Sequence, residues 1–356
     1  MKKYLNKLIL AGISGVLLAP AVQAQVSLVT VGGNASIKVV EDRLTNSVGG
    51  LLPGGTITFN STNSLIFRAN GYWNGGTTNV TWDFNFTGGA AAILDIANQN
   101  HVLLADNTTA IPVSAISIVA PETVGISSTA LGLHQDYSLV APLVYVKNPG
   151  ADLVGVTNLS QRLANYLESS GGTLPATYFG GATANPVYFV GRNSAAAVRQ
   201  VIDANIFFTG AADNFHTNNL GLPTDVGWAG AGSGTEVANN VKVIPGSIGT
   251  VAAQDVSTLP QLSYEGVFFS TASVTNGIYP LWGYERYIYF PAPDSRAPSS
   301  DKLALIKALE ALVSDPGYDH TNTTFFVNKF VSYADVNANV SRSTTLDGGL
   351  ITSQLY

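Results

Sequence analysis

An arginine stands where a strand pattern changes into a helix pattern, within residues 187–207. The apolar, β-branched run 187–190 stops at Gly191-Arg192-Asn193-Ser194, and an alanine-rich helical pattern follows. The first N–H groups of such a helix have no partner within it, and together with the helix dipole they attract anions. Arg192 adds a planar fork of donors that suits phosphate or carboxylate. The segment therefore predicts an anion-binding turn, although its first turn, 195–198, carries no hydroxyl.

Other motifs that carry chemistry are missing from the sequence. His101, His134, His216 and His320 have no partner at metal-ligand spacing. The glycine-rich stretch 230–234 is neither a P-loop nor a nucleophile elbow, and its composition is typical of a turn. We therefore expect no enzyme activity, no metal and no cofactor.

Asp106 and two aromatic segments each allow two interpretations. Asp106 follows an apolar run, where it would either accept a hydrogen bond from a protonated ligand or cap a turn. The aromatic side chains in 264–269 and 279–290 favour packing in the core and between lobes over stacking on a ligand.

The first 24 residues have the pattern of an export signal. Lys2, Lys3 and Lys7 precede the apolar run 8–18, and small residues lead to a cleavage site after Ala24. That run is shorter than the ~20 residues of a membrane-spanning helix, so we expect no membrane insertion after cleavage. No cysteine is present for a disulfide or a lipid anchor. The pattern predicts a periplasmic protein, with an extracellular location as the alternative.

The charge balance argues against nucleic acid and anionic lipid as partners. The chain has 17 basic and 23 acidic residues, a formal net charge of −6, and loss of the leader removes three of the lysines. Polyanions bind basic patches. A small anionic ligand is still allowed, because a local group of N–H donors acts against the net charge.

The elements needed to position these residues alternate between strands and helices. We expect a strand at 26–31 and a helix at 37–44, then hairpin strands within 49–87 and a further turn and helix from Gly88 to residue 97. The hydrophobic run 139–147 is long enough to cross between two lobes. Helices are predicted at 160–167, 236–243 and 302–313. This alternation indicates an α/β chain. The chain is also longer than a single hydrophobic core usually supports, which predicts two lobes.

Three segments, in order, resemble the phosphate-binding family of periplasmic solute receptors. The first is 226–251, with Trp228, the glycine loop, a short helix and the Pro-Gly-Ser-Ile-Gly turn at 245–249. The second is Arg192 with its helix, although the family's Ser-Gly-Thr positions hold Ala-Ala-Val here, at 196–198. The third combines 264–269 with 279–289. Weaker similarities lie at 32–36, at 87–89 and at Asp106.

The resemblance implies a two-lobed, type II binding-protein fold, in which each lobe is a mixed sheet flanked by helices and crossover strands form the hinge. Lobe 1 would combine 25–140 with 266–356, and lobe 2 would span 141–265. A small oxyanion, phosphate or related, would bind between the lobes for an inner-membrane ABC permease. The implied ligand-binding residues are Ser36, Thr87, Gly88, Asp106, Arg192, Asn193 and Ser194.

The missing hydroxyls leave a second hypothesis open. Two hydrogen bonds to a charged group, at ~1.5–3 kcal/mol each, amount to about 3–6 kcal/mol, or roughly two to four decades of affinity. The alternative to transport is a fold reused as a structural or surface-associated protein with a degenerate ligand site.

Overall fold

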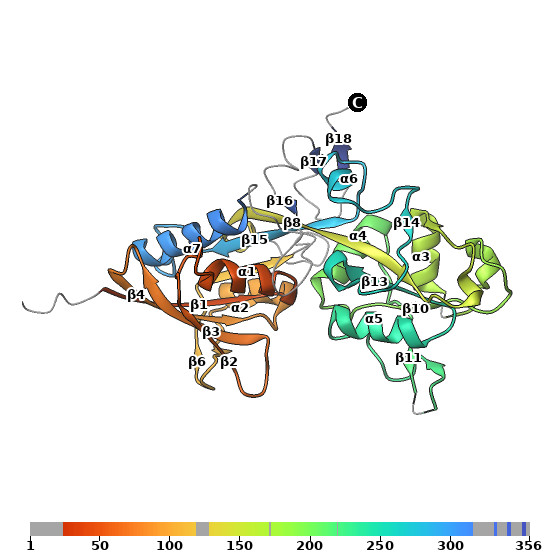
Figure 1. Ribbon diagram of the computed structural model, residues 1–356, viewed down its shortest axis with the longest axis horizontal. Helices are drawn as coiled ribbons and strands as arrows, with labels where there is room; N and C mark the ends of the chain where they lie inside the picture. The colour runs from red at the N-terminus through yellow and green to blue at the C-terminus, as the bar shows by residue number, and fades with distance from the viewer. Residues whose placement is uncertain are drawn as a thin grey trace, which may run out of the picture.

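The computed structural model describes residues 24–118, 128–170, 172–218, 220–315, 331–332, 340–342 and 351–353. Figure 1 shows an elongated molecule with two lobes that long strands connect. The predicted export signal lies outside the described residues except for Ala24, where the first strand begins. Among the described residues, no helix combines the length and the apolar character that crossing a membrane requires.

Strands and helices alternate along the chain. The strands are β1 (Ala24–Gly32), β2 (Thr56–Phe59), β3 (Ile66–Trp73), β4 (Thr78–Asn85), β5 (Val102–Leu103), β6 (Thr109–Ala110), β7 (Ser114–Ile118), β8 (His134–Lys147), β9 (Asn158–Leu159), β10 (Tyr188–Val190), β11 (His216–Thr217), β12 (Pro223–Thr224), β13 (Ser247–Ala252), β14 (Ser263–Tyr264), β15 (Trp282–Tyr289), β16 (Val331–Ser332), β17 (Val340–Arg342) and β18 (Ile351–Ser353). The α-helices are α1 (Ile37–Thr45), α2 (Ala92–Ala97), α3 (Gln161–Ser169), α4 (Ala197–Ile206), α5 (Gly234–Val243), α6 (Thr271–Thr275) and α7 (Ser300–Val313). Short 3-10 helices are η1 (Asn34–Ser36), η2 (Gly89–Ala91), η3 (Ala151–Leu153), η4 (Ala176–Phe179) and η5 (Ala253–Asp255).

One mixed sheet runs through both lobes. Its order is β10-β13-β8-β15-β7-β1-β4-β3-β2, with β16 also paired to β8. The strand β8 joins the two halves, because residues 134–142 pair with β15 and residues 143–147 pair with β13. The predicted crossover strand and the two-lobed α/β fold are therefore confirmed, and the sheets of the two lobes are continuous. The residue bounds given above for the lobes stay a prediction.

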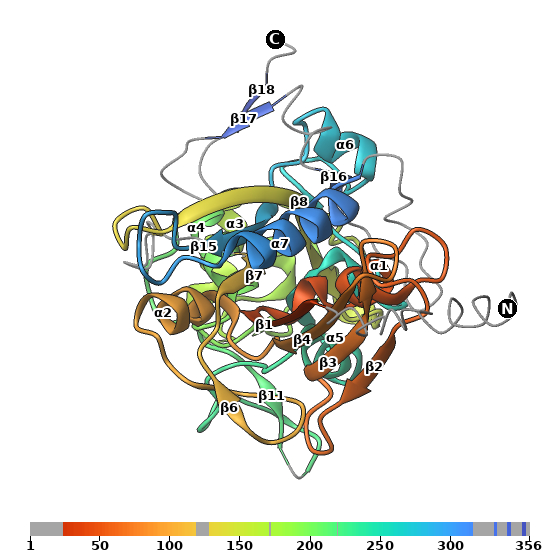
Figure 2. The same ribbon diagram turned by 90° about the vertical axis from the view of Figure 1, so that its left-hand side faces the viewer.

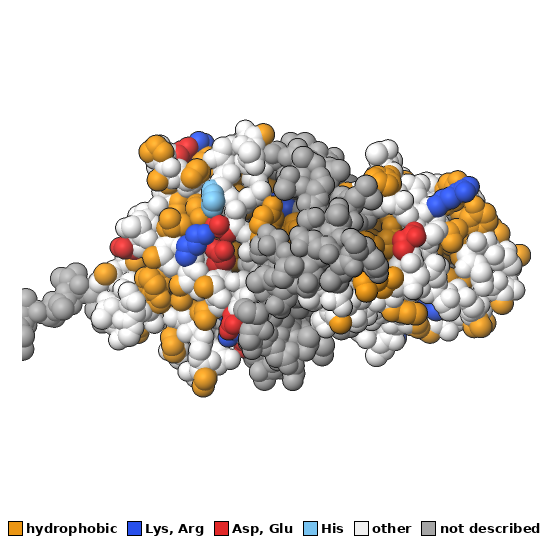
Figure 3. Space-filling view, turned by 90° about the horizontal axis from the view of Figure 1, so that it is seen from above, with side chains coloured by type: hydrophobic (Ala, Val, Ile, Leu, Met, Phe, Trp, Pro, Cys, Tyr) orange, Lys and Arg blue, Asp and Glu red, His pale blue; other side chains and the backbone are white. Residues whose placement is uncertain are grey.

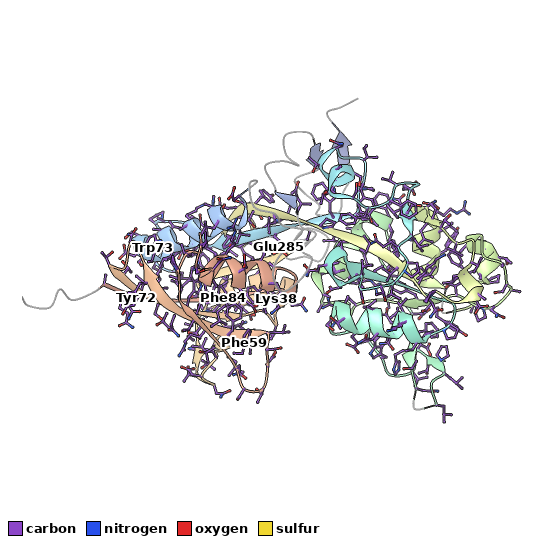
Figure 4. All side chains as sticks on the ribbon, viewed as in Figure 1. Lys38, Phe59, Tyr72, Trp73, Phe84 and Glu285 are labelled. Atoms are coloured by element: carbon purple, nitrogen blue, oxygen red, sulfur yellow. The ribbon has the colours of Figure 1, made fainter. Side chains whose placement is uncertain are left out.

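Lobe 1 is built on the strands from β7 to β2. Aromatic side chains stack across the β3–β4 hairpin, with ring centroids of Phe67 and Phe84 4.8 Å apart and those of Phe84 and Phe86 5.7 Å apart. Figure 4 marks Phe84 within this packed interior. The helices α1 and α7 pack against each other, as Figure 2 shows. A separate apolar cluster joins α2 to the opposite side of β1, which explains why Leu28 and Val31 are both buried.

In lobe 2, a group of charged side chains around Arg199 joins α4 to α3. Arg199 of α4 lies 3.3 Å from Glu168 and 2.5 Å from Asp203 and is only 3% exposed. Burial raises the pKa of the Glu168 carboxyl well above its usual value and also raises that of Asp203. The Tyr145 hydroxyl donates to Glu168 at 3.4 Å. The Arg199–Glu168 contact ties the first half of α4 to α3, and the Tyr145 contact ties α3 to β8.

Candidate functional site

A cavity of about 390 Å³ lies between the two lobes. Lobe 1 contributes two turns and part of the β2–β3 connection to its wall, namely Gly33, Asn34, Asn63, Leu65, Phe86, Thr87, Gly88 and Gly89. Lobe 2 contributes the turn after β10, the start of α4 and the glycine loop, namely Arg192, Asn193, Ala195, Ala196, Ala197, Val198 and Gly232. In the described residues, no cluster of His, Asp and Glu side chains could hold a metal ion.

The turn after β10 places the start of α4 at the cavity. Asn193 shapes this turn: its side-chain oxygen accepts from the Ala195 N–H at 3.1 Å, and its carbonyl accepts from the Ala196 N–H at 3.0 Å. The helix therefore begins at Ala197, two residues later than the alanine pattern suggests. Ala196 caps it in extended conformation without a side-chain hydrogen bond. The first-turn N–H groups consequently lack the side-chain acceptor that usually satisfies them.

The glycine loop positions Arg192. The guanidinium donates from Nε to the Ala231 carbonyl at 3.2 Å and from Nη2 to the Gly232 carbonyl at 2.9 Å. Gly230 has φ +109°, and a Cβ there would lie 2.7 Å from the backbone of Arg192, so only glycine fits. The sequence indicated a turn at this loop; the structure shows that it holds the arginine.

The guanidinium of Arg192 is a buried positive charge without a direct counter-ion. Its residue is 8% exposed, and within the described residues no carboxylate lies within ion-pair distance of it. Burial lowers its pKa, while the more distant carboxylates of Asp255 and Glu236 raise it. Burial raises the pKa of Asp255 to about 6, although Arg192 acts in the opposite direction. The described cavity wall thus holds a cation and no carboxylate, which favours an anionic occupant.

Two turns of lobe 1 face this arginine. The Gly88 N–H donates to the Gly32 carbonyl at 3.1 Å, which ties the turn after β4 to the turn after β1. The Thr87 hydroxyl donates to the Asn85 side chain at 2.5 Å, so its proton is directed away from a ligand. A Cβ on Gly89 would lie 3.5 Å from the Ala195 carbonyl oxygen and 3.9 Å from the Ala197 nitrogen. The lobes therefore meet at the start of α4.

Four of the residues that the sequence pointed to lie together on the cavity wall: Thr87, Gly88, Arg192 and Asn193. Ser194, the next residue along the chain, is exposed and does not line the cavity. Its carbonyl accepts from the Gln200 side chain at 3.2 Å.

Ser36 and Asp106 also lie away from the cavity wall. Ser36 is buried at the start of α1, beside the Glu285 carboxyl. Asp106 pairs with Arg68 at 2.9 Å, and its bonds to Thr108 lower its pKa to about 2. These contacts join the loop of Asp106 to β3, as the turn-stabilising alternative expects.

Several wall residues carried little signal in the sequence. Asn34 and Gly89 follow strand ends, where weak similarities pointed to turns at 32–36 and 87–89. Asn63 and Leu65 lie in a hairpin connection that nothing in the local pattern distinguishes. Only the pairing of β2 with β3 brings them to the site.

Comparison with known proteins gives similarity in structure alone. No protein-family model and no curated protein matches the chain. A phosphate ABC transporter substrate-binding protein from Clostridium perfringens, solved with phosphate, aligns with a TM-score of 0.55 at 12% identity over 85% of this chain and 99% of the other. A high-affinity periplasmic phosphate-binding protein, also solved with phosphate, aligns with a TM-score of 0.52 at 12% identity; the alignment covers 91% of this chain and 96% of the other. An ABC-type phosphate transport receptor from Vibrio cholerae aligns with a TM-score of 0.50 at 14% identity; the alignment covers 82% of this chain and 98% of the other. The chain therefore has the two-lobed α/β fold of periplasmic phosphate-binding proteins.

Proposed function

We propose that this chain is a secreted solute-binding protein that holds a small oxyanion, phosphate or related, between its lobes. The observation that carries the proposal is the buried guanidinium of Arg192 on the wall of an interlobe cavity, next to the uncapped start of α4. Backbone N–H groups and a guanidinium bind an anion without requiring a basic surface. Such a site suits a chain whose net charge is −6, and Figure 3 shows few charged side chains on the described part of one face.

We propose that the site serves solute transport. The solved structures of this fold named above include phosphate transport receptors, and the N-terminal pattern of this chain is that of an exported protein. In the proposed mechanism, the ligand draws the lobes together about β8 and β15. The closed form then binds an inner-membrane ABC permease. The proposed location is the periplasm.

The test is calorimetric titration of the purified mature chain with phosphate, arsenate and sulfate. We expect binding that Arg192→Gln weakens by roughly 10- to 150-fold, because a hydrogen bond to a charged group contributes ~1.5–3 kcal/mol. Arg192→Lys keeps the charge and should lose less. Arg162→Gln is the matched control, since Arg162 is exposed and bonds Tyr166 on α3. Thermal melting of each variant verifies that it is folded.

Two results would refute the proposal. The first is the absence of both heat and thermal shift with every oxyanion. The second is equal affinity of wild type and Arg192→Gln.

The structural or surface-associated alternative rests on the start of α4. Ala195, Ala196, Ala197 and Val198 present methyl groups to the cavity where a phosphate site would use hydroxyls. This alternative predicts an assembled or surface-attached state and no ligand. Cell fractionation and light scattering test it, and a monomeric periplasmic pool would contradict it.

A further inference from the structure

The interlobe cavity is larger than an inorganic oxyanion requires. A five-atom oxyanion fills the space of roughly two to three waters, at about 30 Å³ each. The cavity measures about 390 Å³, within the range of about 300–1,000 Å³ typical of sites for small organic molecules. In the arrangement of the lobes seen here, most of this space is therefore left once an anionic group has bound.

Part of the remaining wall is apolar. Leu65 and Phe86 line it from lobe 1, and the side chains of the α4 start, ending at Val198, line it from lobe 2. Leu65 is half-buried and Ala195 is exposed, so both present apolar surface to the cavity, while Phe86 and Val198, 1% and 5% exposed, lie mostly packed behind it. An apolar wall beside a cation suits a ligand that has an apolar part as well as a charge.

The charge of the wall favours a monoanion. Arg192 is the cation of the described wall, and no carboxylate or histidine lines it. Phosphate groups carry about −1.5 to −2 charges at neutral pH, which one guanidinium neutralises only in part. A substituted oxyanion with a single charge needs no second cation.

We propose that the ligand is a singly charged tetrahedral oxyanion with an apolar substituent, of the sulfonate, sulfate-ester or phosphodiester class. This inference rests on the proposed function and names its substrate class. The charged group binds Arg192 and the first-turn N–H groups of α4. The substituent lies against Leu65 and Ala195, in front of Phe86 and Val198.

The experiment is a calorimetric series on the mature chain with phosphate, sulfate, methanesulfonate, ethanesulfonate, butanesulfonate and diethyl phosphate. Each fully buried CH₂ strengthens binding up to about fourfold. We therefore expect butanesulfonate to bind at least tenfold more tightly than methanesulfonate, and both butanesulfonate and diethyl phosphate to bind more tightly than phosphate or sulfate.

Val198→Thr provides an independent check, because it replaces a methyl on the wall by a hydroxyl of similar size. The variant should bind butanesulfonate more weakly and sulfate more tightly than wild type does. The affinity ratio of butanesulfonate to sulfate should therefore fall or be reversed. The control is Val226→Thr, since Val226 is 80% exposed and outside the cavity wall; it should leave the ligand ratio unchanged.

The outcomes separate the two proposals. Tighter binding of phosphate or sulfate than of the alkylsulfonates, or affinity independent of chain length, overturns the substrate class and leaves the oxyanion receptor standing. Binding of none of the six ligands overturns the receptor as well.

Discussion

Replacing Glu285 by glutamine should make folding stability less sensitive to pH. Glu285 lies on the crossover strand β15, is 1% exposed, and is marked in Figure 4. Neither of its carboxyl oxygens has a hydrogen bond of normal geometry within the described residues. Burial raises the pKa of Glu285 to about 8, although the neighbouring Ser36 side chain acts in the opposite direction. The folded protein therefore keeps this carboxyl protonated at neutral pH.

The magnitude follows from the protons bound in each state. Between pH 4.5, the model-compound value, and pH 8, the folded carboxyl holds a proton that the unfolded chain has released. Stability consequently falls as pH rises across this window, by about 1.4 kcal/mol per pH unit. The total cost approaches 4–5 kcal/mol at pH 8 and does not grow above it, where both states are ionised. Glutamine has the shape of the protonated acid but no such cost.

The assay is urea unfolding of wild type and Glu285→Gln at pH 5, 6, 7 and 8. We expect similar stability at pH 5 and a relative gain for the variant of about 3–4 kcal/mol by pH 8. Asp225→Asn, at an exposed turn, controls for loss of a surface carboxylate. A difference between Glu285→Gln and wild type that is constant from pH 5 to pH 8 would refute a protonated Glu285 in the folded state.

Two further substitutions test how lobe 2 positions the site. Arg199→Met leaves the buried carboxyl of Glu168 and the partly exposed one of Asp203 without their cation and should lower the free energy of unfolding by about 3–5 kcal/mol; Arg162→Met, at an exposed position, should change it little, and equal effects in urea unfolding would contradict the buried ion cluster. Gly234→Ala should lower the melting temperature by several degrees, because its Cβ would overlap a carboxyl oxygen of Asp255 at the start of α5. Gly232→Ala is the control, since the nearest atom to its Cβ is 3.5 Å away; identical melting of both variants would show that the loop relaxes freely.

Local patterns were sufficient for most of the elements. The helix predicted at 302–313 is α7, and the hairpin strands expected within 49–87 are β2, β3 and β4. Apolar spacing and turn residues act over a few positions, so they are readable from one sequence. The beginning of α4 was predicted less precisely, because the hydrogen bond that the Asn193 side-chain oxygen accepts from the Ala195 N–H, rather than helix propensity, decides it.

The sequence by itself determined the turn between a strand and a helix, the arginine in it and the absence of hydroxyls from 195–198, because residue types and short-range patterns are the same whatever surrounds them. Only the tertiary structure decided what faces Arg192. It set the glycine loop against the guanidinium, brought Leu65 and Phe86 to the cavity, and paired Asp106 with Arg68 elsewhere. These outcomes depend on strands far apart in the chain becoming neighbours, and such pairing leaves no local mark in the sequence.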